Sequence, residues 1–234
     1  MVPIPLHDHI RRQSFWSMTL LLIVANVWIF LLELSQGPAL NRMIMALGVV
    51  PARYSTAHLP HHATLEGTLI PLVAAMFLHG GWLHLLGNML FLFVFGRSIE
   101  DRFGHLKFLA IYFLAGLGGS VLHILLNPAS WVPTIGASGA IAGILGAYFI
   151  TFPAARITTL IPLFFFFWTI ELPALLLLGY WFLIQFFTGF RMLAIQSVTG
   201  GGVAWWGHVG GFLVGLFLAL ILRSRSRRKV IEIP

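Results

Sequence analysis

Long apolar runs separated by short polar segments dominate this chain of 234 residues. A helix that crosses a bilayer needs about 20 mostly apolar residues. Such runs lie at about 17–35, 82–99, 108–126, 137–153 and 203–222. The apolar stretch from Ile157 to Phe187 is interrupted by Glu171 and Pro173, so we assign its first part, Ile157–Trp168, to an interfacial or loop segment and place a span at about 172–188. The pattern predicts an all-α membrane protein, a bundle of six transmembrane helices, with seven as the alternative.

Basic residues orient the six predicted spans, because Lys and Arg are enriched in cytoplasmic loops. The side that holds both chain ends carries eleven of the fourteen basic residues, and the other side carries Arg42, Arg53 and Arg191. We therefore expect both termini in the cytoplasm, with a cytoplasmic N-terminal segment at 1–16, a membrane domain at 17–222 and a basic cytoplasmic tail at 223–234. The first external loop, at about 36–81, is long and partly apolar, which favours a partly membrane-embedded functional element over a poorly ordered tether.

The composition agrees with a membrane protein. Hydrophobic residues make up 59% and charged residues 9% of the chain, where a soluble domain has about 45–50% and about 25%. The mean hydropathy is +0.92, and there is no cysteine. These values exclude a disordered chain, a nucleic-acid-binding domain and a disulfide scaffold. Because no signal-peptide cleavage pattern precedes the first apolar run, we expect that run to remain as a membrane anchor.

Polar groups inside a span are costly enough to be candidates for a functional site, and four of those in the apolar runs matter here. His84 and Asn88 lie in the second span, Ser138 opens the fourth, and His208 lies in the sixth. These three spans run from outside to inside in the six-span arrangement. At 1.5 Å per residue, Asn88 lies about 9 Å and His208 about 8 Å below the start of its helix. The four groups should therefore lie at a similar, shallow depth on the external side.

Small residues indicate how these spans pack, because helices in lipid approach closely where small residues repeat every four positions. In the sixth span, His208 is three residues from Gly211 and seven from Gly215, so it lies on the face formed by the small residues. The small residues of the two spans are Gly207, Gly211 and Gly215 in the sixth, and Ser138, Gly139, Ala142, Gly143, Gly146 and Ala147 in the fourth. If these faces pack, the hydroxyl of Ser138 and the imidazole of His208 come within hydrogen-bonding reach.

This set of groups suits nucleophilic catalysis by serine. A serine hydroxyl needs a base to remove its proton, and histidine has a suitable pKa. A tetrahedral oxyanion needs hydrogen-bond donors already in place, which Asn88, His84 and the backbone N–H of Ser138 could supply. The carboxylates on the external side, Glu33 and Glu66, are not convincingly placed for a triad. The residues therefore predict a Ser138–His208 dyad.

Three motifs together resemble those of the rhomboid family of intramembrane serine proteases. In order along the chain they are His79-x4-His84-x3-Asn88, Gly136-x-Ser138-Gly139 and His208-x2-Gly211. The resemblance covers roughly 17–222 and implies a six-helix core that cleaves transmembrane protein substrates with helix-destabilising segments, at or near the external face of the lipid bilayer.

The resemblance also implies a role for each matched residue. Ser138 would be the nucleophile, His208 the general base, and Asn88, His84 and the Ser138 backbone the oxyanion hole. The structural positions of the motifs would be His79, Gly136, Gly139 and Gly211. The resemblance further implies a gate at the fifth span, here the aromatic run Trp181, Phe182, Phe186 and Phe187. Some members carry a tyrosine four residues after the serine that stacks on the histidine, but this chain has Ala142, which leaves open what orients the His208 ring.

Other functions fit the sequence less well. A catalytically silent member or membrane chaperone would not need the dyad, and a small transporter would distribute polar groups to the midplane. A zinc hydrolase is disfavoured because there is no His-Glu-x-x-His motif, and we expect no cofactor. The sequence assigns no purpose to His58, His61 and His62 and leaves the oligomeric state open. The compact chain suggests an integral multi-pass protein of a bacterial inner membrane.

Overall fold

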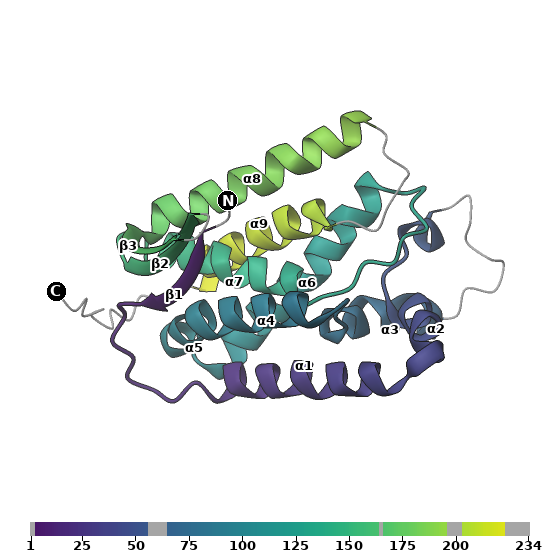
Figure 1. Ribbon diagram of the computed structural model, residues 1–234, viewed down its shortest axis with the longest axis horizontal. Helices are drawn as coiled ribbons and strands as arrows, with labels where there is room; N and C mark the ends of the chain where they lie inside the picture. Colours follow the sequence, from purple (N-terminus) through teal and green to yellow (C-terminus); the bar gives the residue numbers. More distant parts are fainter. Residues whose placement is uncertain (1–2, 56–64, 164–165, 196–202, 223–234) are drawn as a thin grey trace.

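The computed structural model describes residues 3–55, 65–163, 166–195 and 203–222. The described part is a helical bundle with a small sheet at the end toward which α9 runs (Figure 1). The helices are α1 (Ser17–Ser35), α2 (Leu40–Leu47), α3 (Leu65–Ala74), α4 (Trp82–Phe91), α5 (Arg97–Phe103), α6 (His105–Leu126), α7 (Ser138–Thr151), α8 (Ala174–Ile195) and α9 (Trp205–Leu222). A π-helical segment, Leu92–Gly96, joins α4 and α5 into one continuous helix.

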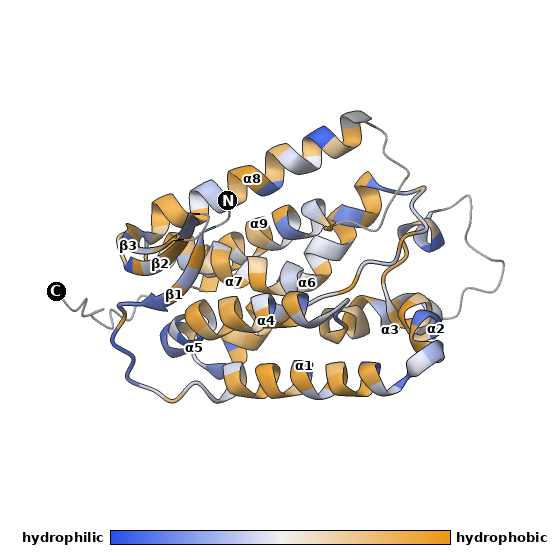
Figure 2. Ribbon diagram, in the orientation of Figure 1, coloured by the Kyte–Doolittle hydropathy of each residue, from blue (hydrophilic) through white to orange (hydrophobic). Residues whose placement is uncertain are grey.

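Among the described residues, five helices are long and apolar enough to cross a membrane: α1, α4 with α5, α6, α8 and α9. The predicted fourth span, 137–153, is only the 14-residue helix α7, about 21 Å long at 1.5 Å per residue against about 30 Å of hydrocarbon. Neighbouring helices bury most of α7, so lipid thickness does not dictate its length. Hydrophobic residues predominate along the helices (Figure 2). The chain is therefore an integral multi-pass membrane protein, while the six-span count stays a prediction.

Helices α6, α7 and α9 pack closely through small residues. A Cβ added to Gly211 would lie 2.0 Å from the Gly139 carbonyl oxygen, and one added to Gly215 would lie 1.9 Å from that of Gly143. Only glycine allows backbones to approach this closely. The constant spacing of these two pairs shows that α7 and α9 run parallel, so both begin at the same end of the bundle. The predicted packing of the two small-residue faces is confirmed.

The prediction of an all-α protein was wrong in one region. The structure has a three-stranded antiparallel sheet in the order β1 (Ile4–Asp8), β2 (Arg156–Leu163) and β3 (Phe166–Pro173). The segment that we assigned to an interfacial region or loop, Ile157–Trp168, is thus most of a hairpin. Strand β2 is central, but Pro162 lies beyond the residues that pair with β1, so its missing N–H removes no bond to that strand.

Buried carboxylates tie the N-terminal segment to the helices at the end where the sheet lies. The carboxylate of Asp8 is fully buried and accepts hydrogen bonds from the side chains of Ser98, Arg12 and Tyr148. Glu100 accepts the backbone N–H groups of the first turn of α1, at distances of 2.8 and 2.7 Å, which satisfies donors that a helix start leaves free. These contacts join α1, α5 and α7 into one unit.

Candidate active site

Ser138 is the first residue of α7 and is held there by an unusual backbone turn. Two residues earlier, Gly136 has a φ of +124°, a conformation that L side chains rarely adopt. The Gly136 N–H donates to the Ala75 carbonyl at 2.8 Å, which fixes the turn against the segment before α4. A Cβ on Gly136 would also lie 2.7 Å from the His84 ring. Glycine is therefore required at this position for both conformation and space.

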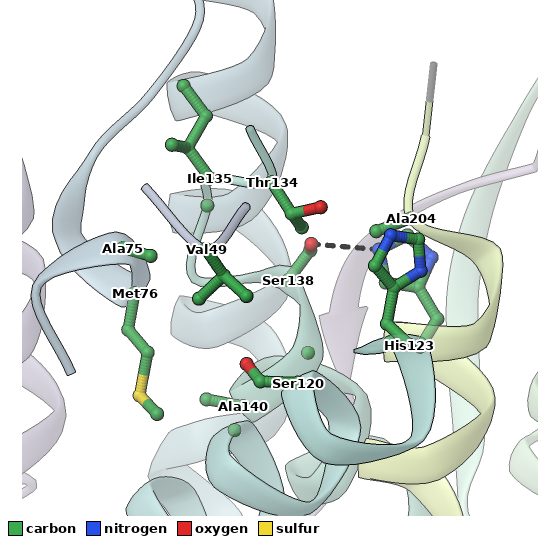
Figure 3. A pocket seen from close by; sticks show the side chains of 15 residues that line it. Val49, Ala75, Met76, Ser120, His123, Thr134, Ile135, Ser138, Ala140 and Ala204 are labelled. Atoms are coloured by element: carbon green, nitrogen blue, oxygen red, sulfur yellow. Dashed lines mark hydrogen bonds between the residues drawn. The ribbon is translucent and has the colours of Figure 1, made fainter. Parts of the chain in front are cut away.

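His208 lies one turn inside α9 and meets Ser138 as expected. Its Nε2 atom lies 2.8 Å from the Ser138 Oγ atom (Figure 3). Its Nδ1 atom lies 2.7 Å from the Oε1 atom of Gln185 on α8. The side chain is buried, and the Trp181 ring lies across it at a centroid distance of 5.8 Å and an interplanar angle of 34°. Both ring nitrogens and one face of the imidazole are thus in contact with other side chains.

His84 and Asn88 lie four residues apart on one face of α4. The Gly80 N–H points to His84 Nδ1 at 3.4 Å, so Nδ1 is an acceptor and Nε2 carries the proton. His84 Nε2 lies beside Gly136. A Cβ added to Gly136 would be 3.6 Å from Asn88 Nδ2. Asn88 Nδ2 is buried and has no hydrogen-bond partner among the described residues. Both side chains therefore present a free N–H donor close to the turn that precedes Ser138.

His79 contacts the segment around the site and does not hydrogen-bond to Ser138 or His208. Its backbone N–H donates to the carboxylate of Glu33, with 3.1 Å to each oxygen, and its ring packs edge-on against His84 at 5.1 Å. Burial lowers the pKa of His79 to about 4, so the ring is neutral at physiological pH. Glu33, which we considered as a triad carboxylate, is instead buried against this backbone. The side chain of Glu66 lies outside the described part of the structure.

A cavity of about 30 Å³ lies beside Ser138 and His208, with room for one or two water molecules. Figure 3 shows the polar side chains of Ser120, His123 and Thr134 around it. Ser120 and His123 lie on α6 and were missed in the sequence, although both are polar groups inside a predicted span. The described residues hold no group of three metal-ligating side chains, and the His58, His61 and His62 cluster lies outside them.

Gln185 was also missed, and the signal for it was in the sequence. It is a polar residue in the interior of the apolar run that forms α8, which is the criterion that selected His84, Asn88 and His208. The aromatic residues of the same run are those of the expected gate. Of these, Trp181 faces His208, whereas Phe187 is 62% exposed.

Comparisons with known proteins place these motifs in a wider context. Residues 66–225 match the family model described as Rhomboid domain. The chain is 31% identical over 198 residues to RHOMBOID-like protein 5 of Arabidopsis thaliana, covering 83% of this chain and 57% of that protein. It is 30% identical over 242 residues to RHOMBOID-like protein 6, mitochondrial, of the same plant, covering 91% and 71%. It is 34% identical over 118 residues to Rhomboid protease GluP of Bacillus subtilis, covering 50% and 21%. The chain thus spans little more than half of the first relative, and the mixture of sources gives no support to a bacterial inner membrane in particular.

Proposed function

The chain belongs to the rhomboid family, and from this premise we propose that it is an intramembrane serine endopeptidase. The family acts on transmembrane substrates within the lipid bilayer and includes proteins named as proteases. The observation that carries the proposal for this chain is the 2.8 Å contact between Ser138 Oγ and His208 Nε2. A serine hydroxyl within hydrogen-bond distance of an imidazole nitrogen is the pair that acyl transfer by serine requires.

In the proposed reaction, Ser138 Oγ attacks the carbonyl carbon of the scissile peptide bond while His208 Nε2 takes the hydroxyl proton. The carbonyl oxygen becomes an oxyanion, which would be stabilised by Asn88 Nδ2–H, His84 Nε2–H and the Ser138 backbone N–H. The C–N bond then breaks, and His208 returns the proton to the leaving amine. Water in the cavity beside Ser120 and His123 would hydrolyse the acyl-enzyme, with His208 again acting as the base.

The orientation in the membrane is part of the proposal. Six spans, with α7 as the short fourth one, would place both termini in the cytoplasm and the N-terminal ends of α4, α7 and α9 near the external face. Substrate helices with Gly or Pro near the cut would enter beside α8 and unwind to reach Ser138. In support, α8 is the spanning helix that brings Trp181 and Gln185 to the site while leaving much of its remaining surface exposed.

A fluorophosphonate probe on the purified protein in detergent tests the proposal. We expect the probe to label the wild-type protein and to leave Ser138→Ala unlabelled, and we expect His208→Ala to abolish labelling because the hydroxyl then has no base. Ser120→Ala serves as a matched control, since it removes a neighbouring hydroxyl and leaves the dyad intact. Cleavage of a transmembrane substrate that persists in Ser138→Ala would refute Ser138 as the nucleophile. A folded wild-type protein that neither reacts with the probe nor cleaves would favour the catalytically silent chaperone instead.

A further inference from the structure

Gln185 hydrogen-bonds to the ring nitrogen of His208 that does not face Ser138. Its Oε1 atom lies 2.7 Å from His208 Nδ1, and both side chains are more than nine-tenths buried. An amide oxygen can only accept a hydrogen bond, so Nδ1 must carry the proton. A neutral imidazole has one N–H, which leaves Nε2 as the bare nitrogen facing the Ser138 hydroxyl. The contact with Gln185 thus selects the one neutral tautomer in which His208 can accept the serine proton.

We propose that Gln185 is a positioning residue that sets the tautomer and orientation of His208, so that the catalytic group consists of Ser138, His208 and Gln185. This inference rests on the proposed protease function. It also explains what orients the His208 ring in this chain, which has Ala142 at the position where some family members have a stacking tyrosine. Trp181 lies four residues before Gln185 on the same face of α8 and covers the ring, while Gln185 holds its edge.

An amide suits this position better than a carboxylate. An ionised carboxylate buried in a membrane protein loses its hydration, and its desolvation penalty is several kcal/mol. The Gln185 amide supplies the acceptor without a net charge. Its dipole still points its negative end at the imidazole, and it therefore stabilises the imidazolium that forms when Ser138 attacks.

The location of Gln185 on α8 has a consequence for access to the site. Helix α8 packs on α9 and, less extensively, on α7, and Leu176, Tyr180 and Leu183 on it are at least half exposed. A displacement of α8 that admits a substrate helix would carry Gln185 and Trp181 away from the ring together. The base would then be competent only after α8 has returned, so that entry of the substrate and alignment of the base become linked steps.

The first test measures the kinetics of cleavage of a transmembrane substrate. Gln185→Leu keeps approximate size and removes the acceptor, so we expect kcat to fall by roughly 10- to 100-fold while KM changes less than about twofold. Gln185→Glu keeps an oxygen at the same position and should retain more activity than Gln185→Leu. Leu21→Ala, at an exposed position on α1 and away from the surface beside α8, should cleave at the wild-type rate. A folded Gln185→Leu protein with wild-type kcat would overturn the proposal.

The second test does not depend on catalysis and uses protein labelled with ¹⁵N-histidine. The His208 resonances are assigned by their loss in His208→Ala. We expect the Nδ1–H tautomer in the wild-type protein and in Gln185→Glu, and a mixture of tautomers in Gln185→Leu. An Nε2–H tautomer in the wild type would overturn the proposal even if Gln185→Leu did not fold. If the wild type cleaved nothing, the protease function would fail, whereas the tautomer would still decide the role of Gln185.

Discussion

The close packing of α7 against α9 makes Gly215 a sensitive position, although it lies two turns from His208. A Cβ at residue 215 would stand 1.9 Å from the carbonyl oxygen of Gly143 and 2.4 Å from its Cα and carbonyl carbon. All three atoms are backbone, so no side chain can rotate away. Ordinary contact begins at 3.4 Å, so Gly215→Ala would force the two helices apart by about 1.5 Å or bend one of them.

That displacement is large compared with the hydrogen bond between the dyad residues. A rigid shift of about 1.5 Å would lengthen the distance from Ser138 Oγ to His208 Nε2 from 2.8 Å to about 4 Å, beyond hydrogen-bond range. Misplacement by about 1 Å can reduce the rate of an enzyme on the order of 100-fold. Overpacking should also lower the free energy of unfolding by about 1–3 kcal/mol. We expect Gly215→Ala to remain folded at low temperature and to cleave at roughly 1% of the wild-type rate.

The assay combines three measurements on the same protein: cleavage of a transmembrane substrate, the rate of fluorophosphonate labelling, and thermal unfolding. Gly207→Ala is the matched control on the same helix, because its Cβ would meet its nearest neighbour, the Ala204 Cβ, at an ordinary 3.5 Å. We expect that control to cleave and label like the wild type. If Gly215→Ala melted at a lower temperature but cleaved at the full rate, the close approach would serve stability only, and the distance between α7 and α9 would not control the geometry of the dyad.

Three further predictions concern the residues around the oxyanion position. Asn88→Ala removes a buried donor without a partner and should lower kcat by about 100- to 1000-fold; a loss of less than severalfold in a cleavage assay would assign the role to His84 or the backbone. Glu33→Ala leaves the His79 backbone N–H without its acceptor and should lower the free energy of unfolding by about 1–3 kcal/mol. Glu33→Gln keeps one oxygen and should lower it by less, as measured by chemical denaturation; equal decreases in the two variants would contradict this. Burial lowers the pKa of His79 from 6.5 to about 4, with the neighbouring His84 adding to the shift. The stability that His79 contributes is therefore complete above pH 6.5 and is lost as the pH falls toward 4, so the melting temperature should drop across that window, and by less in His79→Gln.

The positions of the site residues could be predicted from the sequence because each depends on local geometry. Residues four apart lie on one helical face, and a rise of 1.5 Å per residue converts sequence number into depth. This is sufficient to pair His84 with Asn88 and to place Ser138 and His208 at one level. The repeat of small residues then predicts the contact between two helices that are distant in sequence, because backbone approach needs only the absence of side chains.

The sheet and the contact between Gln185 and His208 could not be predicted in the same way. Strand β2 pairs with residues 4–8, about 150 positions earlier, and neither strand carries an alternation of apolar and polar residues that would mark one buried face. Gln185 satisfied the criterion of a polar group inside a span, but nothing local says which face of α8 turns toward α9. That depends on how Trp181 and Phe182 pack against Phe212, which is a tertiary contact.

The groups that hydrogen-bond within the proposed catalytic site are uncharged, and this follows from the medium in which the site would operate. The carboxylates of Glu33, Asp8 and Glu100 are bonded elsewhere, and His208 contacts an amide instead. When Ser138 transfers its proton to His208, a positive imidazolium and a negative oxyanion form a few ångströms apart, so the net charge of the site does not change during the reaction. A carboxylate in place of Gln185 would stabilise the imidazolium more strongly, but it would leave the resting site with a buried negative charge and weaken the stabilisation of the oxyanion. A dyad supported by an amide therefore balances the two charges of the transition state, with preorganised dipoles in place of bulk water.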